Sequence, residues 1–344
     1  MFSKRLVIFL IIAFSALAFV WSYRFMPQNI IRVVGSSTVY PFVSSVSESY
    51  HVATSERTPI VEHNGTVGGI QIFCKEKGPN SPDILNASRV IYPSEQMLCK
   101  KNGVEDIQGF RIGYDGIIFA SSNQTKSIYS FTNHDLFLAL SARVPKEGKL
   151  VKNFYQNWKE INPNLPDLPI KVYGPPSTSG TRDVFIEQMI TKTCIYLSEA
   201  IQQYPQQYDR IRECKSLRED GKYLEIGEND NVAVQKIENN PTSFAIFGYS
   251  YYDQNRSRIV AHQIGDFAPT SANIIKGVYP LGRPLFVYFK RSRLEEKPEL
   301  KKFLKFLIRD ETIGSSGYLI DKGLIPLTDE ERVDTQRGME PLLE

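Results

Sequence analysis

Short apolar runs alternate with segments of helical periodicity along most of the chain. Apolar runs bounded by glycine, proline or polar residues are typical of buried strands. We expect such strands at 30–34, 58–61, 82–87, 110–121, 168–172, 243–249 and 285–290. Apolar residues at helical spacing predict helices at 42–50, 95–101, 135–141, 151–158, 183–191, 231–238 and 299–308. This alternation indicates an α/β fold.

The length of the chain favours two lobes over one core. A single hydrophobic core rarely grows beyond about 250 to 300 residues, and this chain has 344. The strands at 110–121 and 285–290 are expected to cross between the lobes. We therefore predict a first lobe of residues 27–115 together with 256–344, and a second lobe of residues 116–255, joined by a hinge.

The N-terminus has the charge-then-apolar order of a secretory signal. Lys4 and Arg5 precede an apolar run at 6–21, and the small residues at 16–18 offer a cleavage site. The aromatic residues that end the run could instead sit at a membrane interface. Residues 1–26 are thus predicted to direct export to the periplasm, either as a cleaved signal peptide or as an uncleaved membrane anchor.

Four cysteines fall into two local couples. An even number of cysteines in an exported chain indicates disulfides, and sequence proximity favours the pairs Cys74 with Cys99 and Cys194 with Cys214. The chain has no C-x-x-C motif and no Cys/His spacing suited to zinc. A metal site is therefore not expected.

Composition and motifs exclude several classes of function. Lysine and arginine total 41 against 38 acidic residues, and a net charge of +3 is too small to indicate nucleic acid binding. There is no G-x-x-x-x-G-K-[ST] loop for a nucleotide and no G-x-S-x-G elbow for a serine nucleophile. The histidines are scattered singly, as expected for surface or core positions. These features favour a non-catalytic protein without a cofactor.

Three turns rich in glycine and hydroxyl residues each follow an expected strand and open an expected helix. They lie at 35–41, 64–70 and 173–185, where Ser179 or Thr181 is the expected helix cap. A helix N-terminus presents free backbone N–H groups and the positive end of the helix dipole, which together attract anions. If the strands end at one edge of their sheets, the three turns form an oxyanion cradle.

Five motifs in order resemble the periplasmic phosphate-binding proteins of high-affinity phosphate ABC importers. They are Gly-Ser-Ser-Thr-Val-Tyr-Pro-Phe at 35–42, Gly-Thr-Val-Gly-Gly at 65–69, Ala-Ser-Arg at 87–89, Asp-Gly-Ile at 115–117 and Ser-Gly-Thr-Arg-Asp at 179–183. The resemblance covers 31–327. It implies a two-lobed periplasmic-binding-protein fold, type II-like, with a two-strand hinge, and a monomer that delivers inorganic phosphate to a membrane permease and its ATPase.

The same resemblance nominates the ligand-binding residues. Backbone N–H groups and hydroxyls that match the family's motifs are those of Ser37, Thr38, Val39, Thr66, Ser179, Gly180 and Thr181. Two positions depart from the family. Arg89 stands where studied members have an aspartate, and Pro175 stands where they have an arginine. We expect Arg89 and Arg182 to supply positive charge to the anion instead.

The missing aspartate leaves the choice of oxyanion open. A carboxylate accepts a hydrogen bond from monohydrogen phosphate and repels sulfate, so its absence weakens that selectivity unless Asp115 or another acceptor replaces it. Asp115 is more simply interpreted as a hinge or turn residue, and Arg283 as part of a surface salt bridge. The alternatives are a binding protein for sulfate or molybdate and, less simply, a phosphatase or hydrolase that uses the same cradle.

Overall fold

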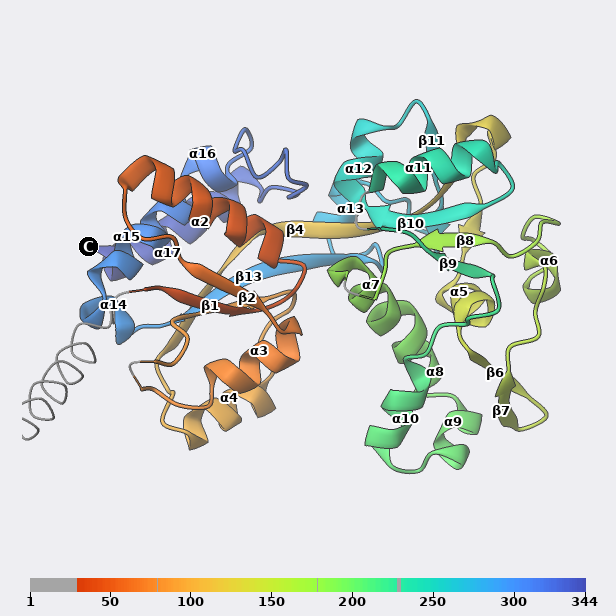
Figure 1. Ribbon diagram of the computed structural model, residues 1–344, viewed down its shortest axis with the longest axis horizontal. Coiled ribbons are helices and arrows are strands. Elements are labelled where there is room, and N and C mark those ends of the chain that lie inside the picture. Colours follow the sequence, from red (N-terminus) through yellow and green to blue (C-terminus); the bar gives the residue numbers. More distant parts are fainter. Residues whose placement is uncertain (1–29, 79, 178, 228–229) are drawn as a thin grey trace, which may run out of the picture.

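The computed structural model describes residues 30–78, 80–177, 179–227 and 230–344. The expected leader at 1–26 lies outside these residues, as does Asn229 of the segment 229–231, which we expect to cap the helix at 231–238. The described residues form two α/β lobes side by side (Figure 1). Figure 1 also shows β4 and β13 running between the lobes, as the apolar strands at 110–121 and 285–290 predict.

The first lobe is built on a mixed sheet. Its strand order is β2 (Ile60–His63), β1 (Arg32–Gly35), β3 (Ile84–Ala87), β13 (Gly282–Lys290) and β4 (Ile107–Ser122). β1 pairs in parallel with β2 and β3, whereas β13 runs antiparallel to β3 and β4. The parallel strands therefore end at the same edge of the sheet, from which the loops after β1 and β3 emerge.

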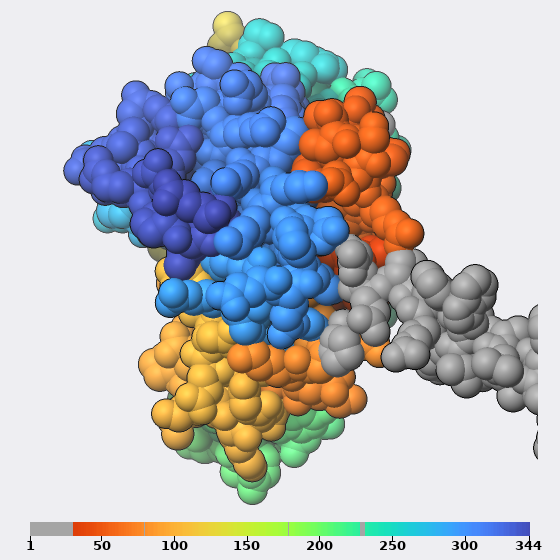
Figure 2. Space-filling view, turned by 90° about the vertical axis from the view of Figure 1, so that its left-hand side faces the viewer, coloured from red at the N-terminus to blue at the C-terminus, as the bar shows by residue number. Residues whose placement is uncertain are grey.

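Helices cover both faces of the first-lobe sheet (Figure 1). One face carries α2 (Tyr40–Thr54), α14 (Arg293–Glu296), α15 (Pro298–Leu307), α16 (Asp310–Ile313) and α17 (Asp329–Leu343), and the other carries α3 (Gly65–Phe73) and α4 (Pro93–Lys101). Tyr50 packs edge-on against Phe303 and Phe306, which joins α2 to α15. In Figure 2 the lighter blue segment near residue 300 lies beside the red-orange α2 and above the orange region of α3 and α4, and the darker blue C-terminal end lies on the side away from α2.

The second lobe extends the same sheet. β10 (Phe244–Gly248) runs antiparallel to the far half of β4, and β8 (Val172–Gly174) and β9 (Tyr223–Glu225) follow in parallel. Its core centres on Phe119 of β4, which stacks on Phe244. The other elements are η1 (Asn123–Thr125), β5 (Ser130–Phe131), α5 (Asn133–Leu140), β6 (Arg143–Lys146), β7 (Lys149–Lys152), α6 (Trp158–Ile161), α7 (Gly180–Phe185), η2 (Ile186–Thr191), α8 (Lys192–Cys194), α9 (Ser198–Gln203), α10 (Gln207–Cys214), α11 (Asp230–Asn239), α12 (Tyr249–Gln254), β11 (Ile259–Ala261), β12 (Gln263–Ile264) and α13 (Ser271–Ile275).

The hinge is a change of partner along one strand. Residues 107–116 of β4 pair with β13, and residues 117–121 pair with β10.

The second boundary between the lobes, expected at residues 255–256, stays a prediction. β11 pairs with β4, and β12 pairs with β5, so these strands favour a second lobe that continues to about residue 281 instead of ending at 255.

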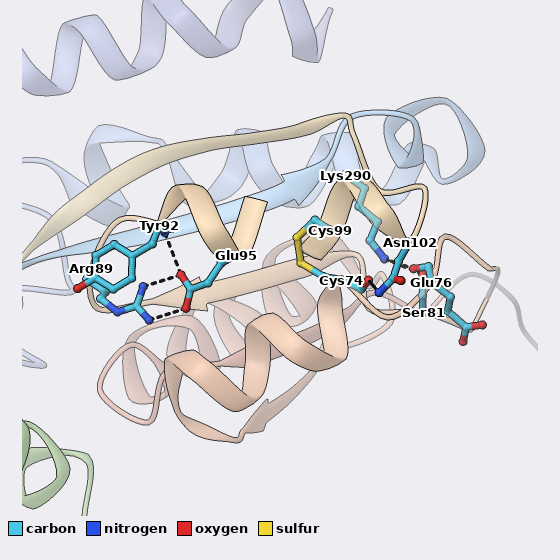
Figure 3. Close-up of a disulfide and its surroundings, with 9 residues drawn as sticks. All are labelled: Cys74, Glu76, Ser81, Arg89, Tyr92, Glu95, Cys99, Asn102 and Lys290. Carbon is cyan, nitrogen blue, oxygen red and sulfur yellow. Dashed lines mark hydrogen bonds and ion pairs between the residues drawn. A yellow bond between two sulfur atoms is a disulfide. The ribbon is translucent and has the colours of Figure 1, made fainter. Parts of the chain in front are cut away.

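Both expected disulfides are present. Cys74 at the end of α3 is bonded to Cys99 in α4, inside a small apolar cluster between these helices and the sheet (Figure 3). Cys194 in α8 is bonded to Cys214 in α10, which fixes the helical excursion of the second lobe to its core.

Two local predictions were wrong. The segment 151–158 was expected to be helical, but β6 and β7 form a hairpin and α6 begins only at Trp158. Glu147 and Gly148 have φ values of 50° and 76°, the two-residue turn that a hairpin needs, and this turn overrides the apolar spacing that follows it. The strand expected at 168–172 lies further along the chain and ends at Gly174, before the two prolines.

Candidate functional site

The loop after β1 is shaped by Gly35. Its φ is 132°, and a Cβ built on it would lie 2.1 Å from the Asn86 carbonyl oxygen at the end of β3. The backbone N–H of Ser36 donates to the same oxygen at 2.9 Å. Only glycine permits this approach. The loop therefore turns directly into α2, where Val39 is the N-cap and makes no side-chain capping hydrogen bond.

The start of α3 lies beside this loop. A Cβ on Gly69 would lie 2.3 Å from the Cα of Gly35, so α3 packs directly on the end of β1. Near the helix start, the Thr66 hydroxyl lies 3.0 Å from the Ser88 hydroxyl and accepts from the Ser88 N–H at 3.2 Å. The loops after β1, β2 and β3 thus meet at one edge of the first-lobe sheet, as the sequence predicts.

The second lobe contributes the start of α7. Ser179 is its N-cap, and its hydroxyl accepts from the Thr181 N–H at 3.3 Å, as expected. A Cβ built on Gly180 would lie 2.8 Å from the Ser37 carbonyl carbon and 2.9 Å from the Thr38 nitrogen. Two hydroxyl-rich loops that are far apart in sequence, one from each lobe, are therefore in direct contact.

Arg283 lies next to the contact between the loop at 36–39 and the start of α7. It stands opposite Asp115 in the β13–β4 pairing and donates to the Asp115 carboxylate from Nη2 at 3.0 Å and from Nε at 3.3 Å. Its Nη2 also donates to the Thr38 hydroxyl. Burial raises the pKa of the Asp115 carboxyl above its usual range, and the Arg283 charge opposes that rise.

The prediction of a surface salt bridge for Arg283 was wrong in its location. Arg283 does form an ion pair, but its side chain is only 9% exposed and that of Asp115 15%. The pair is buried because β13 and β4 are flanked by both lobes where it stands. In the sequence, Arg283 is marked only by its place between a glycine and a proline at the start of the second crossing strand.

Arg182 and Arg89 are held by carboxylates of their own lobes. Arg182 forms an ion pair with Glu225, and its guanidinium lies over the Tyr223 ring at 5.2 Å. Arg89 donates to both oxygens of Glu95, at 2.7 and 2.8 Å, and its guanidinium lies 4.0 Å from the Tyr92 ring centroid (Figure 3). Contact between either arginine and an anion therefore stays a prediction.

The histidines and acidic residues form no metal site among the described residues, in which no group of three or more potential His, Cys, Asp or Glu ligands occurs. His262 is buried in the second-lobe core, where its Nδ1 accepts from the Tyr129 N–H at 3.2 Å and its Nε2 lies 3.0 Å from the Ser121 hydroxyl. Burial lowers its pKa to about 3. It is a satisfied core histidine.

Among the residues that the structure describes, no helix has both the length and the apolar character needed to span a membrane.

A family profile described as a PBP superfamily domain matches residues 26–311. The chain belongs to the PBP superfamily. The match covers the second lobe, the strands between the lobes and most of the first lobe, and the two-lobed α/β fold expected from the sequence is confirmed.

Curated relatives and solved structures agree with this assignment. The chain is 27% identical to Protein SphX of Synechococcus elongatus over 82% of this chain and 74% of that protein. It is 25% identical to the phosphate-binding protein PstS of Staphylococcus saprophyticus over 90% and 84%. A possible phosphate binding protein from Planctomyces limnophilus superposes with a TM-score of 0.73 at 27% identity, covering 92% of this chain and 99% of that one. An ABC-type phosphate transport receptor from Vibrio cholerae shares the fold, with a TM-score of 0.59 at 20% identity over 86% and 100%.

Proposed function

We propose that this protein is an exported solute-binding protein that captures inorganic phosphate between its lobes and delivers it to an ABC-type phosphate importer. One observation carries the proposal. The loop at 36–39 of the first lobe touches the start of α7 at Gly180 of the second, so N–H groups and hydroxyls from both lobes surround one point next to a buried arginine. Such a site holds an oxyanion without any metal or nucleotide.

The candidate ligand set follows from that contact. First-turn N–H groups of a helix have no intrahelical acceptor. The loop that opens α2 touches the start of α7 at Gly180, and α3 packs on the end of β1 beside that loop. Ser37, Thr38, Val39 and Thr66 act from the first lobe, and Ser179, Gly180, Thr181 and Arg182 act from the second. Ligand binding stabilises the closed arrangement because only that arrangement brings both sets together.

The relatives support the proposed ligand and partners. A relative by sequence is named as a phosphate-binding protein, and a solved structure named as an ABC-type phosphate transport receptor shares the fold. On this basis the partners are a membrane permease and its ATPase, and the protein works outside the cytoplasmic membrane, released or held by its N-terminal segment. The resemblance favours binding over catalysis.

Calorimetric titration of the purified full-length chain in mild detergent tests this function. Phosphate is expected to bind tightly with one site per chain, and sulfate and molybdate are expected to bind at least tenfold more weakly. Equal or tighter binding of sulfate or molybdate would assign the protein to the alternative ligand. Absence of binding of all three oxyanions would contradict the proposed function altogether.

A further inference from the structure

Gly323 of the first lobe lies against Ser250 of the second. Gly323 follows α16 in a turn with a φ of 107°, and it is buried although Asp321 and Lys322 beside it are exposed. A Cβ built on Gly323 would lie 2.5 Å from the Ser250 Oγ and 3.0 Å from the Ser250 Cβ. Ser250 belongs to α12, which follows β10 directly. This contact between the lobes is separate from the one at Gly180.

The segment 318–327, which contains Gly323, is fixed to β4 at the hinge. Ile325 and Tyr114 exchange two backbone hydrogen bonds, at 2.8 and 2.9 Å. Tyr114 lies just before the point where β4 changes its partner from β13 to β10. A Cβ on Gly113 would lie 2.7 Å from the Ile325 carbonyl oxygen, so the segment also packs closely on the strand. Gly323 is therefore held on the first-lobe half of this crossing strand.

The helix that follows the segment is tied to the same strand. Glu331 in the first turn of α17 accepts a hydrogen bond from Arg111 Nη1 at 2.6 Å and from the Tyr114 hydroxyl at 2.5 Å. Burial and the hydrogen bond to Glu331 raise the pKa of Tyr114 to about 12, so the hydroxyl stays protonated and continues to donate. The segment cannot move away from β4 without breaking these bonds together with those of Ile325.

The segment and the cradle lie on opposite sides of β4. At Tyr114, one edge of β4 pairs with Pro284 of β13 and the other pairs with Ile325. The loop at the cradle is contacted from the β13 side, where Arg283 donates to the Thr38 hydroxyl. In Figure 1, α12 and the segment after α16 likewise lie on one side of β4 and β13, and the start of α7 lies on the other.

Two contacts on opposite sides of a hinge cannot both loosen in one rotation. A rotation about β4 and β13 that draws Gly180 away from Ser37 moves Gly323 toward Ser250. Little further approach is possible there, because the contact has no room even for a methyl group. We propose that Gly323 and Ser250 form a stop that limits how far the lobes open.

The consequence for affinity rests on the proposed function. A narrow open state has less conformational freedom to lose when the lobes close over phosphate. The closed arrangement is then a larger fraction of the ligand-free population, and the apparent dissociation constant falls in proportion to that fraction. The stop therefore raises the affinity for phosphate without touching the ligand.

Spin labels on Met97→Cys and Tyr208→Cys measure the opening of the full-length chain in mild detergent. These side chains are 71% and 80% exposed, and they lie in α4 of the first lobe and α10 of the second. Both helices lie on the side of the crossing strands where α7 begins (Figure 1). The four natural cysteines are bonded in pairs and do not take the label. Double electron–electron resonance then gives the distance between the labels with and without phosphate.

Ser250→Gly is the deciding variant, because it removes both atoms that a Cβ on Gly323 would meet. The ligand-free distance is expected to lengthen, the phosphate-bound distance is expected to equal that of the wild type, and phosphate affinity is expected to fall about threefold. Ser250→Thr adds a methyl group at the same point and is expected to shorten the ligand-free distance. Gly323 itself is kept, because a side chain is strained at its φ of 107°.

Ser198→Gly is the matched control. Ser198 begins α9, which like α12 is a six-residue helix of the second lobe, and its hydroxyl donates to Glu199 of the same helix. This variant reproduces the loss of helix propensity, and its label distances are expected to equal those of the wild type.

Ligand-free distances equal to the wild type in both Ser250 variants would overturn the stop. The same distances in altered proportions would overturn it as well, because the contact would then stabilise the closed form and not limit the open one. The ligand-free distances decide this even if the wild type binds no phosphate, an outcome that contradicts only the proposed function.

Discussion

Gly180 of the second lobe lies against Ser37 of the first so closely that a side chain at position 180 has no room. A Cβ there would lie 2.8 Å from the Ser37 carbonyl carbon and 2.9 Å from its Cβ. Real Cβ atoms are essentially never found this close to another heavy atom. The contact therefore limits how far the two lobes can close, and it makes closure testable by adding a single methyl group.

Gly180→Ala is expected to weaken phosphate binding about tenfold without lowering stability. The methyl group holds the lobes apart, while alanine near a helix start favours the helix by up to about 1 kcal/mol over glycine. Calorimetry and thermal unfolding of the ligand-free protein measure the two effects separately. Gly338→Ala in α17 is the control, because a Cβ there meets nothing within 4 Å. Equal affinities for the wild type and Gly180→Ala would show that closure does not need this contact.

Arg182→Ala is expected to lower phosphate affinity at least tenfold. Arg182 lies in the first turn of α7, two residues after Gly180, and its side chain is 15% exposed and paired with the half-exposed Glu225. Binding an anion requires the guanidinium to leave or share that partner. Glu225→Gln distinguishes an arginine that binds phosphate from one that only pairs with Glu225. The variant releases Arg182, so phosphate affinity should rise if Arg182 binds the ligand. Calorimetry in which neither variant differs from the wild type removes Arg182 from the site.

The disulfide between Cys74 and Cys99 is expected to stabilise the first lobe by about 3 kcal/mol, from the conformational freedom that it removes from the unfolded chain. The double substitution to alanine should lower the urea midpoint with little change in phosphate affinity, because the bond lies in the apolar cluster under α3 and α4, away from the loop at 36–39. A non-reducing digest should recover both cysteines in one linked peptide. Recovery of two unlinked peptides with free thiols would refute the bond.

The sequence predicts the parts of this site that depend on local chemistry. Glycine and hydroxyl residues after a strand indicate a turn into a helix, and the loop at 36–39, the start of α3 and the cap at Ser179 follow that pattern. The Arg283–Asp115 pair depends instead on the register of strands whose residues are 168 apart in sequence. No periodicity within either strand encodes that register, so the arginine could be placed only as a surface group.

The wrong prediction of a helix at 151–158 also results from strand pairing that the local sequence does not encode. Its apolar spacing fits a helix, but residues 151–152 pair with β6 as the end of β7, and Asn157 forms a β-bridge with Pro169. Arg182 and Arg89 show a related limit. Their sequence positions indicate contact with the anion, with a structural ion pair as the alternative for Arg89, and the fold brings Glu225 and Glu95 within ion-pair distance of them. Long-range contacts thus decide which charges remain available to a ligand.

His262 is expected to make the second lobe sensitive to acid. Its pKa is lowered to about 3 by burial, whereas an unfolded histidine titrates near 6.5. Between these values the unfolded chain binds more protons than the folded one, so stability rises with pH across this window and is lost as pH falls from about 6.5 toward 3. Protonation also removes the Nδ1 lone pair that accepts the Tyr129 N–H. His262→Gln keeps an acceptor and a donor without the titration.

Urea unfolding at several pH values between 3 and 7 measures this effect. The wild type should lose on the order of 5 kcal/mol more than His262→Gln over the full window, about 1.4 kcal/mol for each unit of pKa difference. His134→Gln is the control, because His134 is exposed on α5 and should leave the wild-type pH dependence unchanged. Parallel stability curves for the wild type and His262→Gln would mean that the buried imidazole does not carry the acid sensitivity, and that the carboxylates of the ion pairs carry it instead.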